Sequence, residues 1–184
     1  VLQSRKEISE SSMPHLELHY TEWSASYTPS DPIHDSYHSA AYVLQKIKQV
    51  GDAVQSMSYW VFTDIFEESA PRFTPFHGGF GMLNTQGINK SVFYTYQFLN
   101  RLGETELVNN DPMSWATKDS KGNIQVLAYD FTNTHPGDSV NNKVFYIRDL
   151  PAKDKGTLKI NIASVPQGNY SLKVYKVGYR CNDA

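Results

Sequence analysis

The first half of the sequence alternates between strand-like and helix-like segments, and this order strongly limits the folds open to the chain. Mainly apolar runs predict strands over residues 16–23 and 57–62. Each run is followed by a segment with apolar residues at helical spacing, over residues 35–49 and 90–102. Strand, helix, strand, helix is the order of a parallel α/β sheet or barrel.

The predicted helix over residues 35–49 has local signals at both ends. Asp35 and Ser36 are suited to its amino-terminal cap and first turn. Gly51 is suited to its end, and Gly103 likewise ends the second helix. The long stretch between the second strand and the second helix is rich in proline and glycine, which predicts a loop over residues 64–84.

The second half changes character. Apolar and polar residues alternate over residues 158–162 and again over residues 170–174, which predicts strands with one solvated face. Residues 124–131 and 143–147 predict further strands. The sequence therefore favours an α/β unit followed by an all-β unit, most simply a sandwich. We place the boundary within residues 103–110.

Composition limits the classes of partner. The chain has 184 residues, 17 Lys and Arg against 19 Asp and Glu, and a net charge of −2, with no dense basic run. These values favour neither nucleic acid nor an anionic membrane as partner. No apolar run approaches the ~20 residues that span a bilayer. A single cysteine, Cys181, and a start without a secretory leader favour the cytoplasm.

Acidic residues next to aromatic ones follow both predicted strands. Glu22 lies at the end of the first strand, where the carboxyl ends of parallel strands form the active face of a barrel. By position alone it could act as a nucleophile or a base, or be a solvated carboxylate. Asp64, Glu67 and Glu68 follow the second strand, which contains Trp60. Carboxylates accept hydroxyl hydrogen bonds and aromatic rings cover apolar sugar faces, so this mixture fits a sugar site or a polar loop.

Other chemistries have weaker signals. The glycine-rich segment around His77 lacks the Gly-Lys-Ser/Thr ending of a phosphate loop. His34 and His38 are four residues apart, but no zincin motif surrounds them, so we expect no metal site and no cofactor. The sequence has no Gly-x-Ser-x-Gly elbow, and we expect no special chemistry of Cys181.

Taken together, these segments resemble glycoside hydrolase family 39, whose members include β-xylosidases and α-L-iduronidases. The similar stretches are Leu18-His19-Tyr20-Thr21-Glu22-Trp23-Ser24, Ile33-His34-Asp35-Ser36, Ser58-Tyr59-Trp60-Val61-Phe62, Asp64-Ile65-Phe66-Glu67-Glu68 and Phe76-His77-Gly78-Gly79-Phe80-Gly81. They occur in the family's order, and the similarity continues through residues 177–180 to cover essentially the whole chain. The combination looks closer to the bacterial β-xylosidases than to the iduronidases.

The resemblance implies a fold and a reaction. Residues 1–104 would form the carboxy-terminal part of a TIM-barrel catalytic domain, and residues 105–184 a β-sandwich domain. Glu22, at the end of the seventh barrel strand, would be the nucleophile of a retaining glycosidase. Its substrate would be a xylo-oligosaccharide or another β-xyloside, from which terminal β-D-xylosyl units are released.

The resemblance also implies roles for residues after the eighth strand. Trp60, Glu67 and Glu68 would line the subsite for the cleaved sugar, with the two glutamates bonded to its hydroxyls. Asp35 and His77 match family-typical positions as well, and we assign them to loop structure before catalysis.

The sequence departs from the family in one important respect. A retaining glycosidase needs a second carboxylic acid that protonates the leaving oxygen. The family carries it in an Asn-Glu-Pro segment on an earlier strand, and no such segment occurs here. We therefore expect a chain truncated at both ends, without its general acid/base.

Three alternatives remain open from the sequence. The isolated chain could be a non-catalytic fragment that acts only as a structural or accessory unit, and its unpaired strand edges would favour association into a homo-oligomer. The parent could also be an α-L-iduronidase or a β-glucosidase. Glu67 and Glu68 favour a neutral sugar, whereas Arg72 keeps an acidic sugar open.

Overall fold

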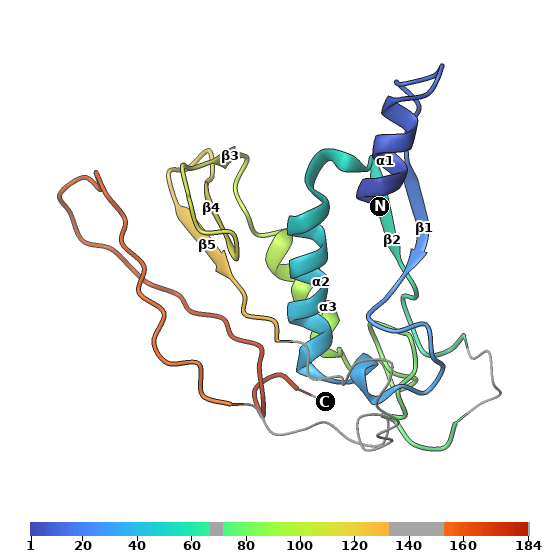
Figure 1. The fold of residues 1–184 in the computed structure, drawn as a ribbon. Coiled ribbons are helices and arrows are strands. Elements are labelled where there is room, and N and C mark those ends of the chain that lie inside the picture. The colour runs from blue at the N-terminus through green and yellow to red at the C-terminus, as the bar shows by residue number, and fades with distance from the viewer. Residues whose placement is uncertain (67–71, 133–152, 184) are drawn as a thin grey trace.

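The computed structural model describes residues 1–66, 72–132 and 153–183 (Figure 1). The helices and strands in chain order are α1 (Leu2–Ser9), β1 (His19–Trp23), the 3-10 turn η1 (Pro32–His34), α2 (Tyr37–Val50), η2 (Gly51–Ala53), β2 (Ser56–Tyr59), α3 (Ser91–Leu99), β3 (Thr105–Glu106), β4 (Ser114–Lys118) and β5 (Ile124–Ala128). The described part of the chain is therefore a mixed α/β structure, as predicted for its first half.

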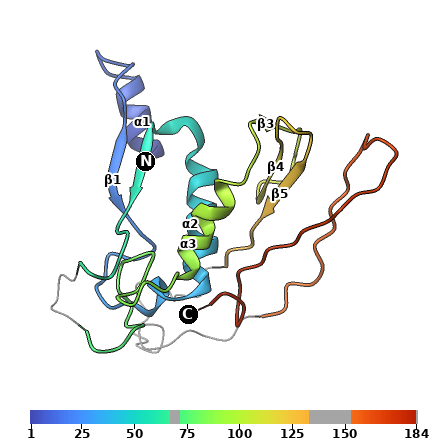
Figure 2. The same ribbon diagram turned by 180° about the vertical axis from the view of Figure 1, so that it is seen from behind.

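Strands β1 and β2 run parallel, with His19 opposite Ser56 and Trp23 opposite Tyr59. Helix α2 connects them, because parallel neighbours require a long crossover. In both views the helices α2 and α3 lie between this strand pair and the β3–β5 sheet (Figures 1 and 2). The predicted strand–helix–strand–helix order is confirmed, and the parallel pairing brings the carboxyl ends of β1 and β2 together.

Helix α2 begins and ends where its local sequence predicts. The hydroxyl of Ser36 accepts a hydrogen bond from the His38 amide at 3.1 Å, and Gly51 follows the last turn with a positive φ of 48°. On the buried side of α2, Val43 and Leu44 face α3, where Val92 is fully buried as well. Each of these side chains contributes roughly 1.5–3 kcal/mol through burial.

Helix α1 is not predicted from the sequence, because none of its residues is buried and no apolar stripe marks it. It is held to the amino ends of β1 and β2 by Arg5. The guanidinium donates to Ala53 O at 2.7 Å, Leu16 O at 2.8 Å and Gln55 Oε1 at 2.8 Å. Gln55 Oε1 also accepts from the Leu18 amide at 2.6 Å. One side chain thus ties three segments together.

We expect Arg5→Met to destabilise the protein by about 1–3 kcal/mol, because it leaves the oxygen acceptors at these strand ends without their charged donor. The matched control is Lys6→Met on the same helix, since Lys6 is exposed and its described ion pair is a 3.9 Å contact with Glu10. Chemical denaturation of both variants measures the difference. Equal midpoints for the two variants would contradict the assigned role of Arg5.

A small antiparallel sheet follows α3. Strands β3, β4 and β5 form an antiparallel sheet, in which β4 pairs with β5 from Ser114 opposite Ala128 to Lys118 opposite Ile124. The ammonium of Lys48 on α2 lies 4.8 Å from the centre of the Trp115 ring on β4. This cation–π contact joins the sheet to the helical layer.

The predicted strands over residues 158–162 and 170–174 are wrong for this structure. Residues 153–177 run as two long extended stretches beyond β3–β5, with no strand assigned (Figure 2). Leu158 and Ile160 are exposed, as are Leu172 and Val174. Alternation decides which face of a strand would be buried, but a strand also needs a hydrogen-bonded neighbour, and these stretches have none among the described residues. The predicted strand over residues 143–147 lies outside the described residues.

The last described residues return to the start of α2. Asp183 Oδ1 accepts a hydrogen bond from the Tyr37 amide at 2.8 Å, and the rings of Tyr37 and Tyr179 meet edge to face with centroids 6.0 Å apart. Figure 1 shows the carboxyl end beside the beginning of this helix. A carboxylate at a helix amino end satisfies an otherwise unpaired amide and is favoured by the helix dipole.

Candidate active site

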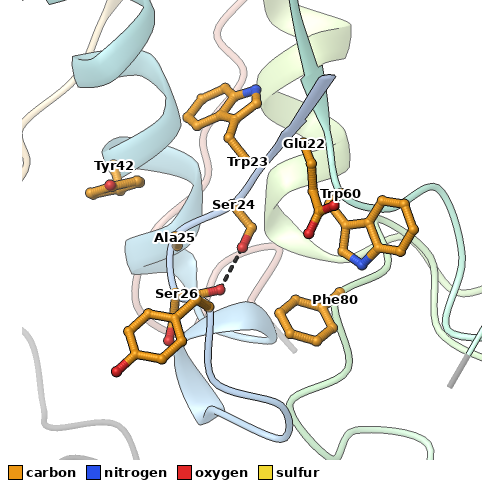
Figure 3. A pocket seen from close by; sticks show the side chains of 9 residues that line it. Glu22, Trp23, Ser24, Ala25, Ser26, Tyr42, Trp60 and Phe80 are labelled. Carbon is orange, nitrogen blue, oxygen red and sulfur yellow. Dashed lines mark hydrogen bonds between the residues drawn. The ribbon is translucent and has the colours of Figure 1, made fainter. Parts of the chain in front are cut away.

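A pocket of about 400 Å³ lies at the carboxyl ends of β1 and β2. It is lined by Glu22, Trp23, Ser24, Ala25, Ser26, Tyr27, Tyr42, Trp60 and Phe80. The residues come from the end of β1, the loop after it, helix α2, the segment after β2 and the glycine-rich loop (Figure 3). Two of the residues predicted for the site, Glu22 and Trp60, therefore lie in one pocket.

Glu22 is the second-to-last residue of β1 and its side chain is exposed. Within the described part of the chain its carboxylate has no hydrogen-bond or ion-pair partner. In Figure 3 it points into the space bounded by the rings of Trp60 and Phe80. An ionised carboxylate that is free of a partner keeps its lone pairs available for a ligand in the pocket.

Trp60 follows β2 and is placed by the backbone of β1. Its amide donates to Trp23 O at 2.8 Å, and its ring meets Phe66 edge to face at 5.3 Å. The indole Nε1 is buried and has no hydrogen-bond partner among the described residues. Trp60 thus presents an aromatic face and an unused donor beside Glu22 (Figure 3).

Glu67 and Glu68, the two glutamates predicted to bind sugar hydroxyls, lie outside the described residues. Asp64, from the same acidic segment, is described and fully buried. It lies in the polar cluster around Lys90, where both of its carboxylate oxygens are engaged.

An aromatic row lies behind the pocket. Trp23 contacts Tyr59 edge to face at 6.0 Å, and Tyr59 contacts Tyr96 at the same distance. Burial raises the pKa of Tyr59 to about 12, and burial also raises the pKa of Tyr96. Raised pKa values keep both phenols neutral near neutral pH, so they support the pocket through packing rather than as acids or bases.

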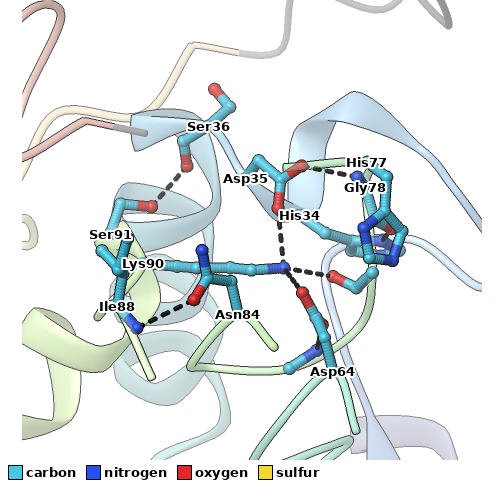
Figure 4. Close-up of polar contacts among 12 residues, drawn as sticks. His34, Asp35, Ser36, Asp64, His77, Gly78, Asn84, Ile88, Lys90 and Ser91 are labelled. Carbon is cyan, nitrogen blue, oxygen red and sulfur yellow. Dashed lines mark hydrogen bonds and ion pairs between the residues drawn. The ribbon is translucent and has the colours of Figure 1, made fainter. Parts of the chain in front are cut away.

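Beneath the pocket, the fully buried ammonium of Lys90 is held by three oxygens (Figure 4). It lies 2.6 Å from Asp35 Oδ1, 2.6 Å from Asp64 Oδ2 and 2.9 Å from Gly79 O. These contacts use all three of its hydrogen-bond donors. Lys90 immediately precedes α3, so one side chain connects the starts of both helices, the segment after β2 and the glycine-rich loop.

The two carboxylates of this cluster also hold the glycine-rich loop through its backbone. Asp35 Oδ2 accepts from the Gly78 amide at 2.5 Å, and Asp64 Oδ1 accepts from the Gly81 amide at 2.7 Å. Gly78 has a φ of +77°, which disfavours residues with a side chain. Phe80, a wall of the pocket, is thereby fixed between two anchored glycines.

We expect Gly79→Ala to destabilise the protein by about 1–3 kcal/mol, because its methyl group would overlap the Asp64 carboxylate. Gly168→Ala is a suitable control, since the nearest atom to its added methyl group would be on Tyr170 at 3.9 Å. Denaturation midpoints distinguish the two variants. A Gly79→Ala protein as stable as the control would show that the loop can move away at little cost.

The structure bears on the two further positions that match the family. Asp35 lies in the Lys90 cluster, as the assignment to loop structure predicts. His77 Nδ1 lies 2.9 Å from Thr74 O within the same loop. Sequence reasoning missed Lys90 altogether and gave His34 no role, although His34 is fully buried beside the pocket. The lysine lacked a local signal, because its partners come from three distant segments.

Residues 1–66, 72–132 and 153–183 contain neither a cluster of metal-ligating side chains nor a membrane-spanning helix. No group of three His, Cys, Asp or Glu side chains there is arranged to hold a metal ion. No helix in these ranges is long and apolar enough to cross a membrane.

An exposed carboxylate among aromatic rings, at the carboxyl ends of parallel strands, is an arrangement suited to glycoside hydrolysis. Comparison with known proteins agrees with this class. The chain belongs to glycosyl hydrolases family 39, because the model of that family matches residues 1–179.

The relatives are named as β-xylosidases. The Beta-xylosidase of Geobacillus stearothermophilus is 40% identical over 122 residues, which are 66% of this chain and 24% of that protein. The Beta-xylosidase of Caldicellulosiruptor saccharolyticus is 38% identical over 136 residues, which are 70% of this chain and 28% of that protein.

A solved structure supports the same relationship. The crystal structure of a monomeric beta-xylosidase from Caulobacter crescentus CB15 matches with a TM-score of 0.73 and 43% identity, over 81% of this chain and 30% of that one. The chain thus spans between 24% and 30% of the length of these three proteins.

Proposed function

We propose that this chain supplies the nucleophile and part of the sugar subsite of a retaining β-xylosidase. The observation that carries the proposal is the placement of Glu22. Its carboxylate is exposed, lacks a partner within the described residues and points into a pocket walled by Trp60 and Phe80. Membership of family 39 and the names of the relatives favour xylosides as substrates.

In the proposed reaction, Glu22 attacks the anomeric carbon of a terminal β-D-xylosyl unit and forms a covalent glycosyl-enzyme. A second carboxylic acid protonates the leaving oxygen and then takes a proton from the attacking water. Because the Asn-Glu-Pro segment is absent here, that acid comes from another part of the complete enzyme. The isolated chain is therefore expected to have little or no turnover.

Sugar binding is assigned to the aromatic side of the pocket. The ring of Trp60 offers an apolar face to the sugar, and its indole N–H is an unused donor. Glu67 and Glu68 are proposed to accept hydrogen bonds from sugar hydroxyls. Arg72 is exposed, and no described contact ties it to the Glu22 pocket, which favours a neutral sugar over an iduronide.

We also propose that residues 1–104 complete a TIM barrel and that residues 105–184 belong to a β-sandwich. The parallel pairing of β1 with β2 and the antiparallel β3–β5 sheet support this division. In the sandwich, the exposed apolar side chains of residues 158–174 would face strands supplied from outside the described residues.

An alternative is that the isolated chain acts only as a structural or accessory unit. The exposed apolar residues of the extended segment favour it, because such surfaces promote association. Light scattering after size-exclusion chromatography tests this alternative. A compact monomer that melts cooperatively would argue against it.

Covalent labelling tests the proposed function directly. An activated 2-deoxy-2-fluoro-xyloside needs little acid assistance, and its fluorine slows release of the sugar, so the glycosyl-enzyme should persist. We expect mass spectrometry of the complete enzyme carrying this segment to find one adduct, on Glu22. Labelling of the chain alone would show that its sugar subsite is sufficient. An adduct on a different carboxylate would refute the assignment of Glu22.

A further inference from the structure

His34 has an unusual set of hydrogen-bond partners. The ring is completely buried, with Nδ1 2.7 Å from Gly78 O and Nε2 2.9 Å from Ser26 O. Backbone carbonyl oxygens only accept hydrogen bonds, so each contact requires a proton on the facing ring nitrogen. A neutral imidazole has one N–H, whereas the imidazolium has two. The two contacts together therefore fit the charged ring.

The buried charges near His34 favour the same protonation state. Asp31, Asp35 and Asp64 are at most 9% exposed, and the fully buried Lys90 is the one lysine or arginine among the buried side chains of the described residues. Asp35 and Asp64 pair with that ammonium, and Asp31 is buried on the segment of His34, so the buried carboxylates outnumber the buried ammonium. A buried imidazolium reduces that excess, and unpaired charge inside a protein is costly.

The partners of His34 are walls of the pocket or lie next to them. Ser26 lines the pocket from the loop after β1, and Phe80 lines it from the glycine-rich loop. The His34 ring lies against Phe80, with centroids 4.6 Å apart. Its other contact is Gly78, two residues before Phe80. One ring thus sets the separation of two loops that meet beside Glu22 (Figures 3 and 4).

We propose that His34 is held as an imidazolium and is a positioning residue that fixes the two loops on either side of the sugar pocket. This inference rests on the proposed glycosidase function of that pocket. A neutral ring would turn one of the two N–H···O contacts into a repulsion between lone pairs and would release one loop.

Several charged or titratable groups lie on the segments that meet near His34. They are Asp31 and Asp35 on its own segment, Asp64 after β2, His77 on the glycine-rich loop, Lys90 before α3 and Glu22 across the pocket. His77 is the other imidazole among them, so His77→Gln must be compared with His34→Gln.

The test uses the complete enzyme carrying this segment, with its histidines labelled with nitrogen-15. We expect the His34 ring nitrogens to have similar chemical shifts, both bonded to hydrogen, throughout the active pH range. His34→Gln should lower kcat/KM by up to about 100-fold, because displaced pocket walls misplace the sugar. His77→Gln should lower kcat/KM far less.

His15→Gln is the matched control, since His15 is exposed and does not line the pocket. Its kinetics should equal those of the unaltered enzyme. A single neutral tautomer of His34 in the fully active enzyme would overturn the proposal, and this spectrum is decisive even if His34→Gln does not fold. A kcat/KM of His34→Gln equal to that of the unaltered enzyme would also overturn it. Failure of the proposed function has a different signature: no adduct forms on Glu22, whatever the state of His34.

Discussion

Glu22→Gln is expected to lower the turnover of β-xylosides by the complete enzyme by at least about 10⁴-fold, because the amide has nearly the shape of the carboxylate but cannot attack the anomeric carbon. Since Glu22 has no described hydrogen-bond or ion-pair partner, stability should change little. Steady-state kinetics with an aryl β-xyloside and a thermal melt separate loss of chemistry from loss of fold.

A second variant tests the position of the attacking group. In Glu22→Ala, azide can occupy the vacated space and attack from the same face, so an activated β-xyloside should give an α-xylosyl azide. Glu17→Gln is the control, because Glu17 is exposed and its described contact is with His19 at 3.0 Å. Near-normal turnover by Glu22→Gln would remove this residue from the mechanism.

Lys90→Met should destabilise the protein by about 3–5 kcal/mol, the largest stability effect that we expect. Removing the ammonium leaves the carboxylates of Asp35 and Asp64 buried without their cation. Urea denaturation measures the loss. Lys6→Met removes an exposed lysine with a single weak ion pair and should change stability by less than about 1 kcal/mol.

A double variant tests the cause of this effect. Asp64→Asn combined with Lys90→Met removes one of the unpaired charges and leaves an oxygen to accept from Gly81. It should be more stable than Lys90→Met alone, because the coupling between these two sites is electrostatic. If both proteins unfold at the same urea concentration, lost packing explains the effect of Lys90→Met better than unpaired charge.

The features predicted correctly from the sequence are mainly local. Ser36 and Gly51 mark the ends of α2. The Ser36 side chain accepts a hydrogen bond from the nearby His38 amide, and Gly51 adopts a positive φ at the carboxyl end, so both signals are local. The alternation of strands and helices likewise predicted that β1 and β2 would be parallel, which brings Glu22 and Trp60 to one pocket. The residue types of this pocket were recognisable because they follow strand ends.

The features that were missed depend on distant partners. In the sequence, Asp64 looks like a sugar-binding carboxylate. The structure shows instead that it forms an ion pair with Lys90, which lies just before α3. Residues 170–174 have the alternation of a strand but no neighbouring backbone to complete it. Sequence periodicity specifies a face for burial and leaves the partner undetermined.

The contact between Asp183 and Tyr37 has a consequence for the order in which the protein is made. The two residues are 146 positions apart, and the carboxylate accepts from the first amide of α2. A ribosome that adds roughly 5–20 residues per second produces Asp183 roughly 7–30 s after Tyr37. During that interval the nascent helix relies on Ser36 alone for its described side-chain cap. The start of α2, beside His34 and Asp35, thus gains its hydrogen bond to Asp183 late in translation, after the pocket-lining residues have been synthesised.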